Sequence, residues 1–204
     1  MDYAQEAINS LLWIAKTLAM TAVVFSVGIF LLVRFTHWGK QFWQFAGGYL
    51  SPRRSIKPLL FFLLIVAMTL VSVRISLVHS EWYNNMYTSL QEFNEPVFWD
   101  QMVLFCVIAT SSVIAALLSY YLEQRFSIDW IEWLNGQLVD KWMNNRAYYK
   151  TQYVSANLDN PDQRIQQDVQ SYVRTTLSLS TGVIDAVTSM ISYTILLWGL
   201  AGPM

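Results

Sequence analysis

Four long blocks of apolar residues constrain this chain more than any other feature of its sequence. Each block reaches the ~20 residues that a helix needs to cross ~30 Å of hydrocarbon, and none shows the strict alternation of barrel strands. Backbone amides in lipid must find hydrogen-bond partners within their own segment, so helices are the spanning elements. The sequence therefore predicts an all-α, polytopic membrane protein with four transmembrane helices, at about residues 11–33, 58–78, 102–121 and 177–200.

Composition agrees with this prediction. Hydrophobic residues make up 54% of the chain and charged residues only 13%, which is too apolar for an ordinary water-soluble domain. A secretory signal peptide is the alternative for the first block. The ten residues before it contain two acids and no basic residue, and the apolar run is longer than a leader needs. We therefore expect a genuine first span.

The distribution of Lys and Arg predicts the orientation, because these residues favour cytoplasmic connections. Residues 34–57 carry five of them, and residues 122–176 carry six. Residues 79–101 carry none and contain four acids instead. This pattern predicts both termini on the non-cytoplasmic side, an outer loop over residues 79–101 and cytoplasmic segments elsewhere.

A short amphipathic helix is predicted directly after the first span, completing a first region over residues 1–57. Its signal is a run of aromatic residues at steps of three and four, the spacing of one helical face: Phe35, Trp38, Phe42, Phe45 and Tyr49. Trp and Tyr favour the membrane interface, so we expect an elbow helix there, broken at Gly47 and Gly48. Arg53, Arg54 and Lys57 beyond the break would meet anionic head groups. A simple aromatic belt is the alternative.

The second region, residues 58–204, is predicted to contain a cytoplasmic hairpin. Helical spacing continues past the third block to about residue 145, and a helix over residues 102–145 would be ~65 Å long. A second long helix is predicted to begin at Asn160, Pro161 and Asp162, because Asn caps helices and Pro suits the first helical position. The loop between them falls at about residues 150–159, so the hairpin covers about residues 122–176.

The fourth block carries a stripe of polar residues at helical spacing: Ser178, Thr181, Asp185, Ser189 and Ser192. An acid in an apolar helix is costly and usually faces a bundle interior, a route or a partner. The stripe is therefore a candidate lining for a translocation path. If the helix enters the membrane only near Val183, Asp185 would instead be a hydrated interfacial residue. The sequence leaves both interpretations open.

Five ordered motifs resemble bacterial inner-membrane ABC transporters of the YddA type, which fuse a permease and an ATPase in one chain. These motifs are EWYNNMY with LQEFNEPVFW, RAYYKTQY, NPDQRIQQDV, TLSLSTG and ILLWGLAG. The same family is related to peroxisomal fatty-acyl transporters and, more distantly, to the SbmA/BacA peptide transporters. The resemblance runs through almost the whole chain.

The resemblance implies that one group of residues couples the spans to an ATPase: Asn160, Pro161, Asp162, Gln163, Arg164 and Asp168. Arg164 and Asp168 are spaced to pair across one helical turn. The alternative is that this group merely starts a helix. The resemblance also implies a homodimer in the inner membrane, with further permease helices and an ATPase domain as partners.

This chain contains no GxxxxGK[ST] phosphate loop, so it is not expected to hydrolyse ATP by itself. ATP and Mg²⁺ are expected only on the ATPase domain, and the chain is interpreted as the N-terminal portion of a transporter. A proton-coupled, SbmA/BacA-like segment and a truncated, non-functional fragment remain alternatives. No metal site is expected, because Cys106, His37 and His79 match no ligand spacing. A net charge of −1 gives no reason to expect nucleic acid, and the transported solute is not indicated.

Overall fold

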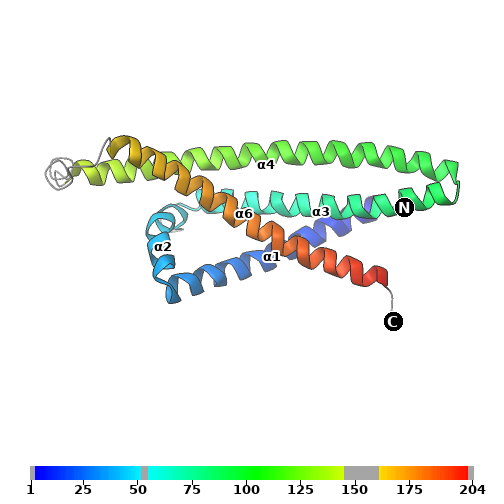
Figure 1. The fold of residues 1–204 in the computed structure, drawn as a ribbon, viewed down its shortest axis with the longest axis horizontal. Coiled ribbons are helices and arrows are strands. Elements are labelled where there is room, and N and C mark those ends of the chain that lie inside the picture. Colours follow the sequence, from blue (N-terminus) through cyan, green and yellow to red (C-terminus); the bar gives the residue numbers. More distant parts are fainter. Residues whose placement is uncertain (1–2, 52–54, 145–160, 202–204) are drawn as a thin grey trace. The chain divides into compact units, whose positions relative to one another are not determined.

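The computed structural model describes residues 3–51, 55–144 and 161–201, and every element in these residues is a helix (Figure 1). The helices are α1 (Tyr3–Phe35), α2 (His37–Leu50), α3 (Lys57–Gln91), α4 (Glu95–Met143) and α6 (Pro161–Ala201). Of these, α1, α3, α4 and α6 are long and apolar enough to cross a membrane. The predicted all-α fold with four candidate spans is therefore confirmed.

The helices contribute to two compact units. Unit 1 contains residues 1–26, 63–122 and 181–204, and unit 2 contains residues 27–62 and 123–180. At 1.5 Å per residue, the 49-residue α4 is about 73 Å long and the 41-residue α6 about 61 Å. Both helices are about twice as long as the hydrocarbon is thick.

The core of unit 1 is built on one face of α3. Leu70, Val73 and Leu77 are almost fully buried at spacings of three and four, and so are Ile108 of α4 and Ile184 of α6. Many other apolar side chains in this unit are exposed, as expected for a surface that lipid or further helices cover.

A charged residue joins α1 to α3 within unit 1. The Nε atom of Arg74 donates a hydrogen bond of 3.1 Å to Ser10, and its guanidinium lies 5.9 Å from the ring centre of Trp13. A cation within about 6 Å of an aromatic face is attracted to it. Arg74 therefore has partners on α1.

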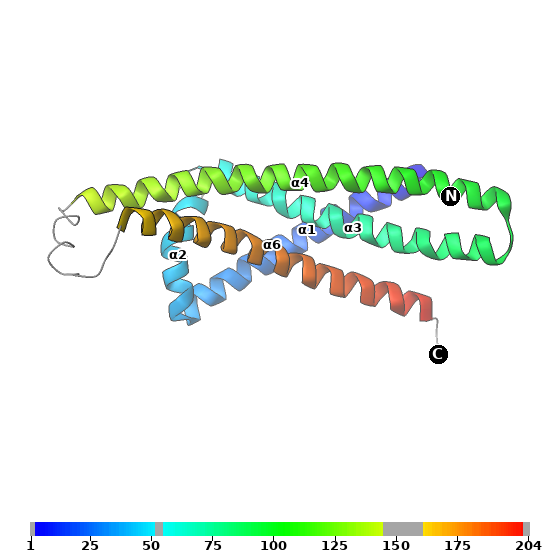
Figure 2. The same cartoon turned by 45° about the horizontal axis from the view of Figure 1, so that its top comes forward.

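The expected outer loop over residues 79–101 is almost entirely helical, which corrects the sequence prediction. Helix α3 continues to Gln91 and α4 begins at Glu95, so the connection is a tight turn at residues 92–94 (Figures 1 and 2). Trp82 holds the two helices together, because its Nε1 donates a hydrogen bond of 2.8 Å to the carbonyl oxygen of Gln101. His79 stacks on Trp82 with ring centres 5.4 Å apart.

The turn itself closes α3 with a Schellman motif. The amide of Asn94 bonds to the carbonyl of Ser89 at 3.0 Å, and the amide of Phe93 bonds to the carbonyl of Leu90 at 3.3 Å. Asn94 then caps α4, since its Oδ1 accepts a bond of 3.4 Å from the amide of Val97. This geometry requires a left-handed residue before Asn94, and Phe93 supplies it with φ of 52°.

Unit 2 is held together by an aromatic cluster on α2, α4 and α6. Tyr49 of α2 stacks on Trp130 of α4, with ring centres 5.5 Å apart and planes at 4°. Phe126 lies edge-on to both rings. From α6, the Tyr172 hydroxyl donates a hydrogen bond of 3.1 Å to the carbonyl oxygen of Phe42. In both views the first turns of α6 run beside the end of α4 (Figures 1 and 2).

The predicted elbow helix is present as α2, with two differences from expectation. It begins after Thr36, whose hydroxyl accepts a bond of 3.0 Å from the amide of Gly39, and it continues through Gly47 and Gly48 to Leu50. Its aromatic residues also divide between two environments. Trp38 is 86% exposed, whereas Tyr49 is buried in the cluster, so the end of α2 is anchored to protein.

The two long helices that were predicted to form a hairpin are present as α4 and α6. The predicted loop at residues 150–159, the head-group residues Arg53 and Arg54, and the capping residue Asn160 all lie outside the described ranges. Helix α6 begins at Pro161, the position predicted for its first residue. Near its start, Val169, Val173 and Leu177 are buried at steps of four residues, along one face of the helix.

Replacing Phe93 with Gly should stabilise the fold. A left-handed conformation costs a non-glycine residue about 1–2 kcal/mol, and glycine removes this cost. Glycine also raises the conformational entropy of the unfolded chain, which offsets part of the gain in stability. Because Phe93 is 93% exposed, no packing is lost. We expect a net gain of about 1 kcal/mol or less in the free energy of unfolding, measured in mixed SDS and dodecyl maltoside micelles. Phe93→Ala, which keeps the strain, is the control, and equal stability of the two variants would contradict this account of the turn.

Replacing Gly48 with Ala should destabilise the aromatic cluster. A β-carbon at Gly48 would lie 2.8 Å from Cη2 of Trp133, which packs against Tyr49 at 5.4 Å. Overpacking of this kind costs about 1–3 kcal/mol, more than the helix propensity that alanine adds. Gly136→Ala in α4 is the matched control, since nothing lies within 4 Å of the added atom. Gly48→Ala should lower the free energy of unfolding and Gly136→Ala should raise it by up to about 1 kcal/mol; the same sign for both would reject the close contact.

Candidate functional site

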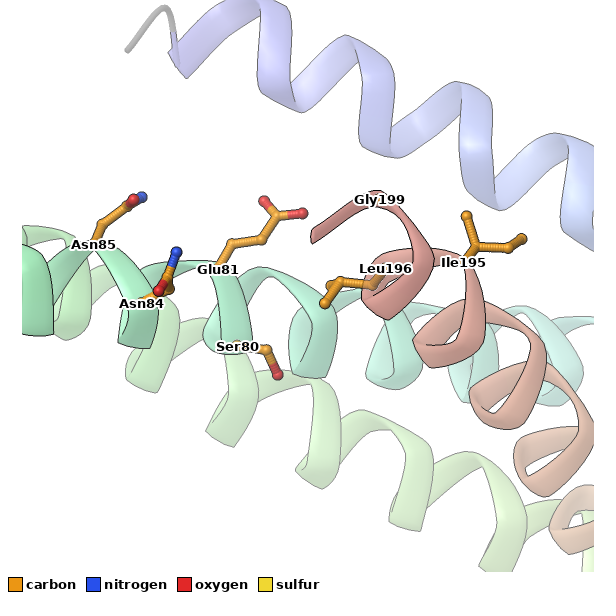
Figure 3. Close-up of a pocket in the computed structure, with 7 residues that line it drawn as sticks. All are labelled: Ser80, Glu81, Asn84, Asn85, Ile195, Leu196 and Gly199. Carbon is orange, nitrogen blue, oxygen red and sulfur yellow. The ribbon is translucent and has the colours of Figure 1, made fainter. Parts of the chain in front are cut away.

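A groove in unit 1 is the first candidate site. It has a volume of about 410 Å³ and lies between α3 and the end of α6 (Figure 3). The α3 side is polar and consists of Ser80, Glu81, Asn84 and Asn85. The α6 side consists of Ile195, Leu196 and Gly199. One wall therefore offers a carboxylate, amides and a hydroxyl, and the other wall is largely apolar.

The position of Glu81 gives the groove its charge. In Figure 3 its carboxylate points from α3 toward the last turns of α6, and Asn84 and Asn85 follow it along α3. The four α3 residues occupy positions i, i+1, i+4 and i+5, which is one face of a helix. Among the described residues that line the groove there is no Lys or Arg. This arrangement suits a ligand with hydrogen-bond donors or positive charge on one side and apolar groups on the other.

The polar stripe of α6 runs along the same helical face as the apolar wall of this groove. From Thr181 the stripe steps by four, four and three residues to Ser192, and further steps of four and three lead to Leu196 and Gly199. Residues at such spacings lie one above another on a helix. Four members of the predicted stripe therefore share a face of unit 1 with the groove-lining residues.

These stripe residues differ in exposure. Asp185 is exposed, and Thr181, Ser189 and Ser192 are half-buried. The neighbouring face of α6 is buried through Ile184 and Thr188. The polar stripe thus flanks the packed face of the helix. The fifth predicted member, Ser178, is exposed and belongs to unit 2.

The predicted coupling residues lie at the start of α6, in unit 2. Gln163, Arg164 and Asp168 are exposed, on the side of the helix away from the buried Val169 and Val173. Pro161 and Asp162 belong to the first turn, and Asn160 falls outside the part of the chain that the structure describes. An ion pair in the described residues joins Arg125 to Asp129 on α4 at 3.4 Å. Arg164 and Asp168 instead present their charges on an open surface.

The described ranges contain no group of three or more His, Cys, Asp or Glu side chains that could hold a metal ion. Cys106 is exposed on α4 within the third span. His79 is stacked against Trp82 and Phe105, with ring centres at 5.4 and 6.4 Å. Both residues therefore belong to helix surfaces and packing.

Comparison with known proteins decides the family. Residues 46–204 match the model described as ABC transporter transmembrane region 2. The chain belongs to this ABC transporter family.

The relatives of this ABC transporter chain support the same family assignment. An uncharacterized ABC transporter ATP-binding protein of Haemophilus influenzae is 85% identical over all 204 residues, which cover 34% of that protein. A second protein of the same description and organism is 37% identical over 99% of the chain and 34% of its own length. The inner membrane ABC transporter ATP-binding protein YddA of Escherichia coli is 31% identical over 71% of the chain and 26% of its length.

The chain spans about a third of the length of the two Haemophilus relatives. The matched family model begins within α2, and the 85% identical relative aligns with α1 as well. The first span is thus shared with a relative, and the ABC transporter resemblance read from the motifs is confirmed.

The sequence motifs did not identify the groove of this ABC transporter chain. EWYNNMY was used only as a family motif, and its residues were assigned to a loop. The available signal was the i, i+1, i+4, i+5 spacing of Ser80, Glu81, Asn84 and Asn85, which is diagnostic only once the segment is known to be helical. Its pairing with Gly199 joins segments more than 110 residues apart and needs the fold.

Proposed function

We propose that this chain forms the first membrane-spanning part of an ATP-driven transporter of the bacterial inner membrane. Its family and the three relatives named above, each described as an ABC transporter ATP-binding protein, support this proposal. These descriptions also favour ATP over proton coupling. The ATPase domain, with its ATP and Mg²⁺, would be a partner of this segment, and two copies would assemble the working permease.

Within that transporter, the polar face of α6 and the groove would line the route of the solute. The observation that carries this proposal is the unbroken helical spacing from Thr181 to Gly199, which joins the polar stripe to a groove containing Glu81. An exposed acid such as Asp185 in an apolar helix is costly in lipid unless water or solute reaches it. A translocation route would bring both water and solute to this carboxylate.

The groove would open on the non-cytoplasmic side. The segment that supplies its polar wall lies within residues 79–101, which contain four acids and neither Lys nor Arg. Connections of this kind are typical of the outer side. The N terminus would then also be non-cytoplasmic, because one span separates it from the basic segment at residues 34–57.

Coupling to the ATPase would use the exposed surface at the start of α6. Gln163, Arg164 and Asp168 present charge and amide groups to the outside of unit 2, while Val169, Val173 and Leu177 hold the same helix in the unit. A rigid helix with a polar, accessible start can transmit a push from a partner domain along its axis. The same helix continues to the stripe and the groove.

Nucleotide-dependent accessibility of residue 185 tests the proposed route without knowledge of the solute. Cys106 is the only cysteine of these 204 residues, so Cys106→Ser, together with replacement of any cysteine elsewhere in the intact transporter, gives a cysteine-free background. We expect Asp185→Cys to react with a membrane-impermeant maleimide several-fold differently in the nucleotide-free and ATP–vanadate states. Val187→Cys, exposed on the other side of α6, is the matched control and should not respond.

The two interpretations of Asp185 make different predictions in this experiment. A route residue changes its exposure when the transporter switches between states. A merely hydrated interfacial residue reacts equally in both states, and that result would reject the route. Ser189→Cys, one helical turn further along the stripe, should follow Asp185→Cys.

Charge reversal at Asp168 tests the coupling surface separately. In the Asp185→Cys transporter, Asp168→Lys should abolish the response of maleimide labelling to nucleotide while ATP hydrolysis continues. The exposed neighbour Gln167→Lys places a lysine at the adjacent position without removing an acid, and it should leave the response in place. A full labelling response in Asp168→Lys would show that Asp168 takes no part in coupling, whatever the role of the stripe.

A further inference from the structure

A second groove, in unit 2, belongs neither to the stripe nor to the coupling residues. It has a volume of about 310 Å³ and lies between α2 and α4. Its lining combines Gln44, Phe45 and Gly48 of α2 with a face of α4: Trp133, Leu134, Gln137, Leu138 and Lys141. A volume near the lower limit of ligand sites suits a head group and the first part of an acyl chain.

The connections of α2 set the level of this groove at the membrane face. A single residue, Thr36, separates α1 from α2, and six residues separate α2 from α3. Both α1 and α3 are candidate spans, so α2 must remain where the first span leaves the membrane and the second enters it. Exposed Trp38, Trp43 and Phe45 on α2 fit this level, because aromatic residues favour the interface. The α2 side of the groove therefore lies at the level of the lipid head groups.

The chemistry of the lining selects an anion. Lys141 contributes an ammonium group, and Gln44 and Gln137 contribute amide donors, whereas none of the described lining residues carries a carboxylate. Asp140 precedes Lys141 along α4 but is turned about 100° away around the helix. A phosphodiester accepts hydrogen bonds from both donor types. Phe45, Leu134 and Leu138 supply an apolar surface beside these donors.

The bare backbone at Gly48 shapes the groove. A β-carbon there would lie 2.8 Å from the Trp133 ring, so glycine is what allows α2 to approach α4 at this point. The ring of Trp133 consequently forms part of the wall, where a glycerol backbone and an acyl chain can pack against it. The groove is thus polar at Lys141 and aromatic at Trp133.

We propose that this groove binds one phospholipid with an anionic head group, the phosphate lying against Lys141 and the Gln137 amide. The bound lipid would fix α2 to α4 at the membrane face. This proposal stands on the geometry of unit 2 and is independent of the route on α6.

Binding of defined lipids to the intact protein in detergent tests the proposal. Phosphatidylglycerol and phosphatidylcholine with the same acyl chains are titrated separately and counted by native mass spectrometry. We expect one phosphatidylglycerol to bind more tightly than phosphatidylcholine, and Lys141→Gln to weaken its binding about five-fold, the value of one lysine near an anionic surface. Lys40→Gln removes the same charge from an exposed position of α2 outside the groove and should weaken binding far less.

The possible outcomes distinguish a specific lipid site from other kinds of binding. Equal affinity for the two lipids, or equal losses in Lys141→Gln and Lys40→Gln, would show only general attraction to the membrane and overturn the site. Displacement of the lipid by millimolar inorganic phosphate would indicate a free-phosphate site and would also overturn it. Because Lys141 is exposed, its replacement should leave the midpoint of unfolding unchanged, and this measurement excludes misfolding as the cause of weaker binding.

Discussion

The need to satisfy every backbone amide without water is the constraint on which the rest of this structure depends. In hydrocarbon an unpaired amide costs several kcal/mol, so each crossing must be an unbroken helix. This explains why the chain turns where it can use side chains and caps: Thr36 begins α2, and the Schellman turn with Asn94 links α3 to α4. Even the strained backbone of Phe93 follows from it, because closing α3 in this turn requires a left-handed residue.

The same constraint restricts where polar side chains can be placed. Several serines and threonines in the spans return their hydroxyls to carbonyls of their own helix, as Thr69, Ser72 and Thr110 do. Arg74 and Trp82 instead join neighbouring elements, one to Ser10 and the other to the carbonyl of Gln101. Asp185 and Glu81, by contrast, are exposed. The hydrogen-bonded polar groups thus hold the helices together, whereas the two exposed acids are the groups proposed to meet a solute.

The sequence predicted the elements that depend on local pattern and missed those that depend on contacts. Four apolar blocks, the helical spacing that continues past the third block, and Pro161 at the start of α6 were readable because period and caps are local. Residues 79–101 were assigned to a loop because charge and polar residues there resemble a connection, although Trp82 and the turn at Asn94 support continuous helices. Neither groove could be derived, because each joins one face of two helices far apart in the chain.

The length of α6 connects these observations. An interfacial helix or a single span needs far fewer than its 41 residues. The additional turns carry the exposed Gln163, Arg164 and Asp168 together with the buried Val169 and Val173, so they are both accessible to a partner and fixed within their unit. No Pro interrupts the helix after Pro161, and Gly182 lies in open space rather than at a close contact. In the proposed transporter, this helix is the covalent connection through which a displacement at the polar start would reach the stripe that contains Asp185.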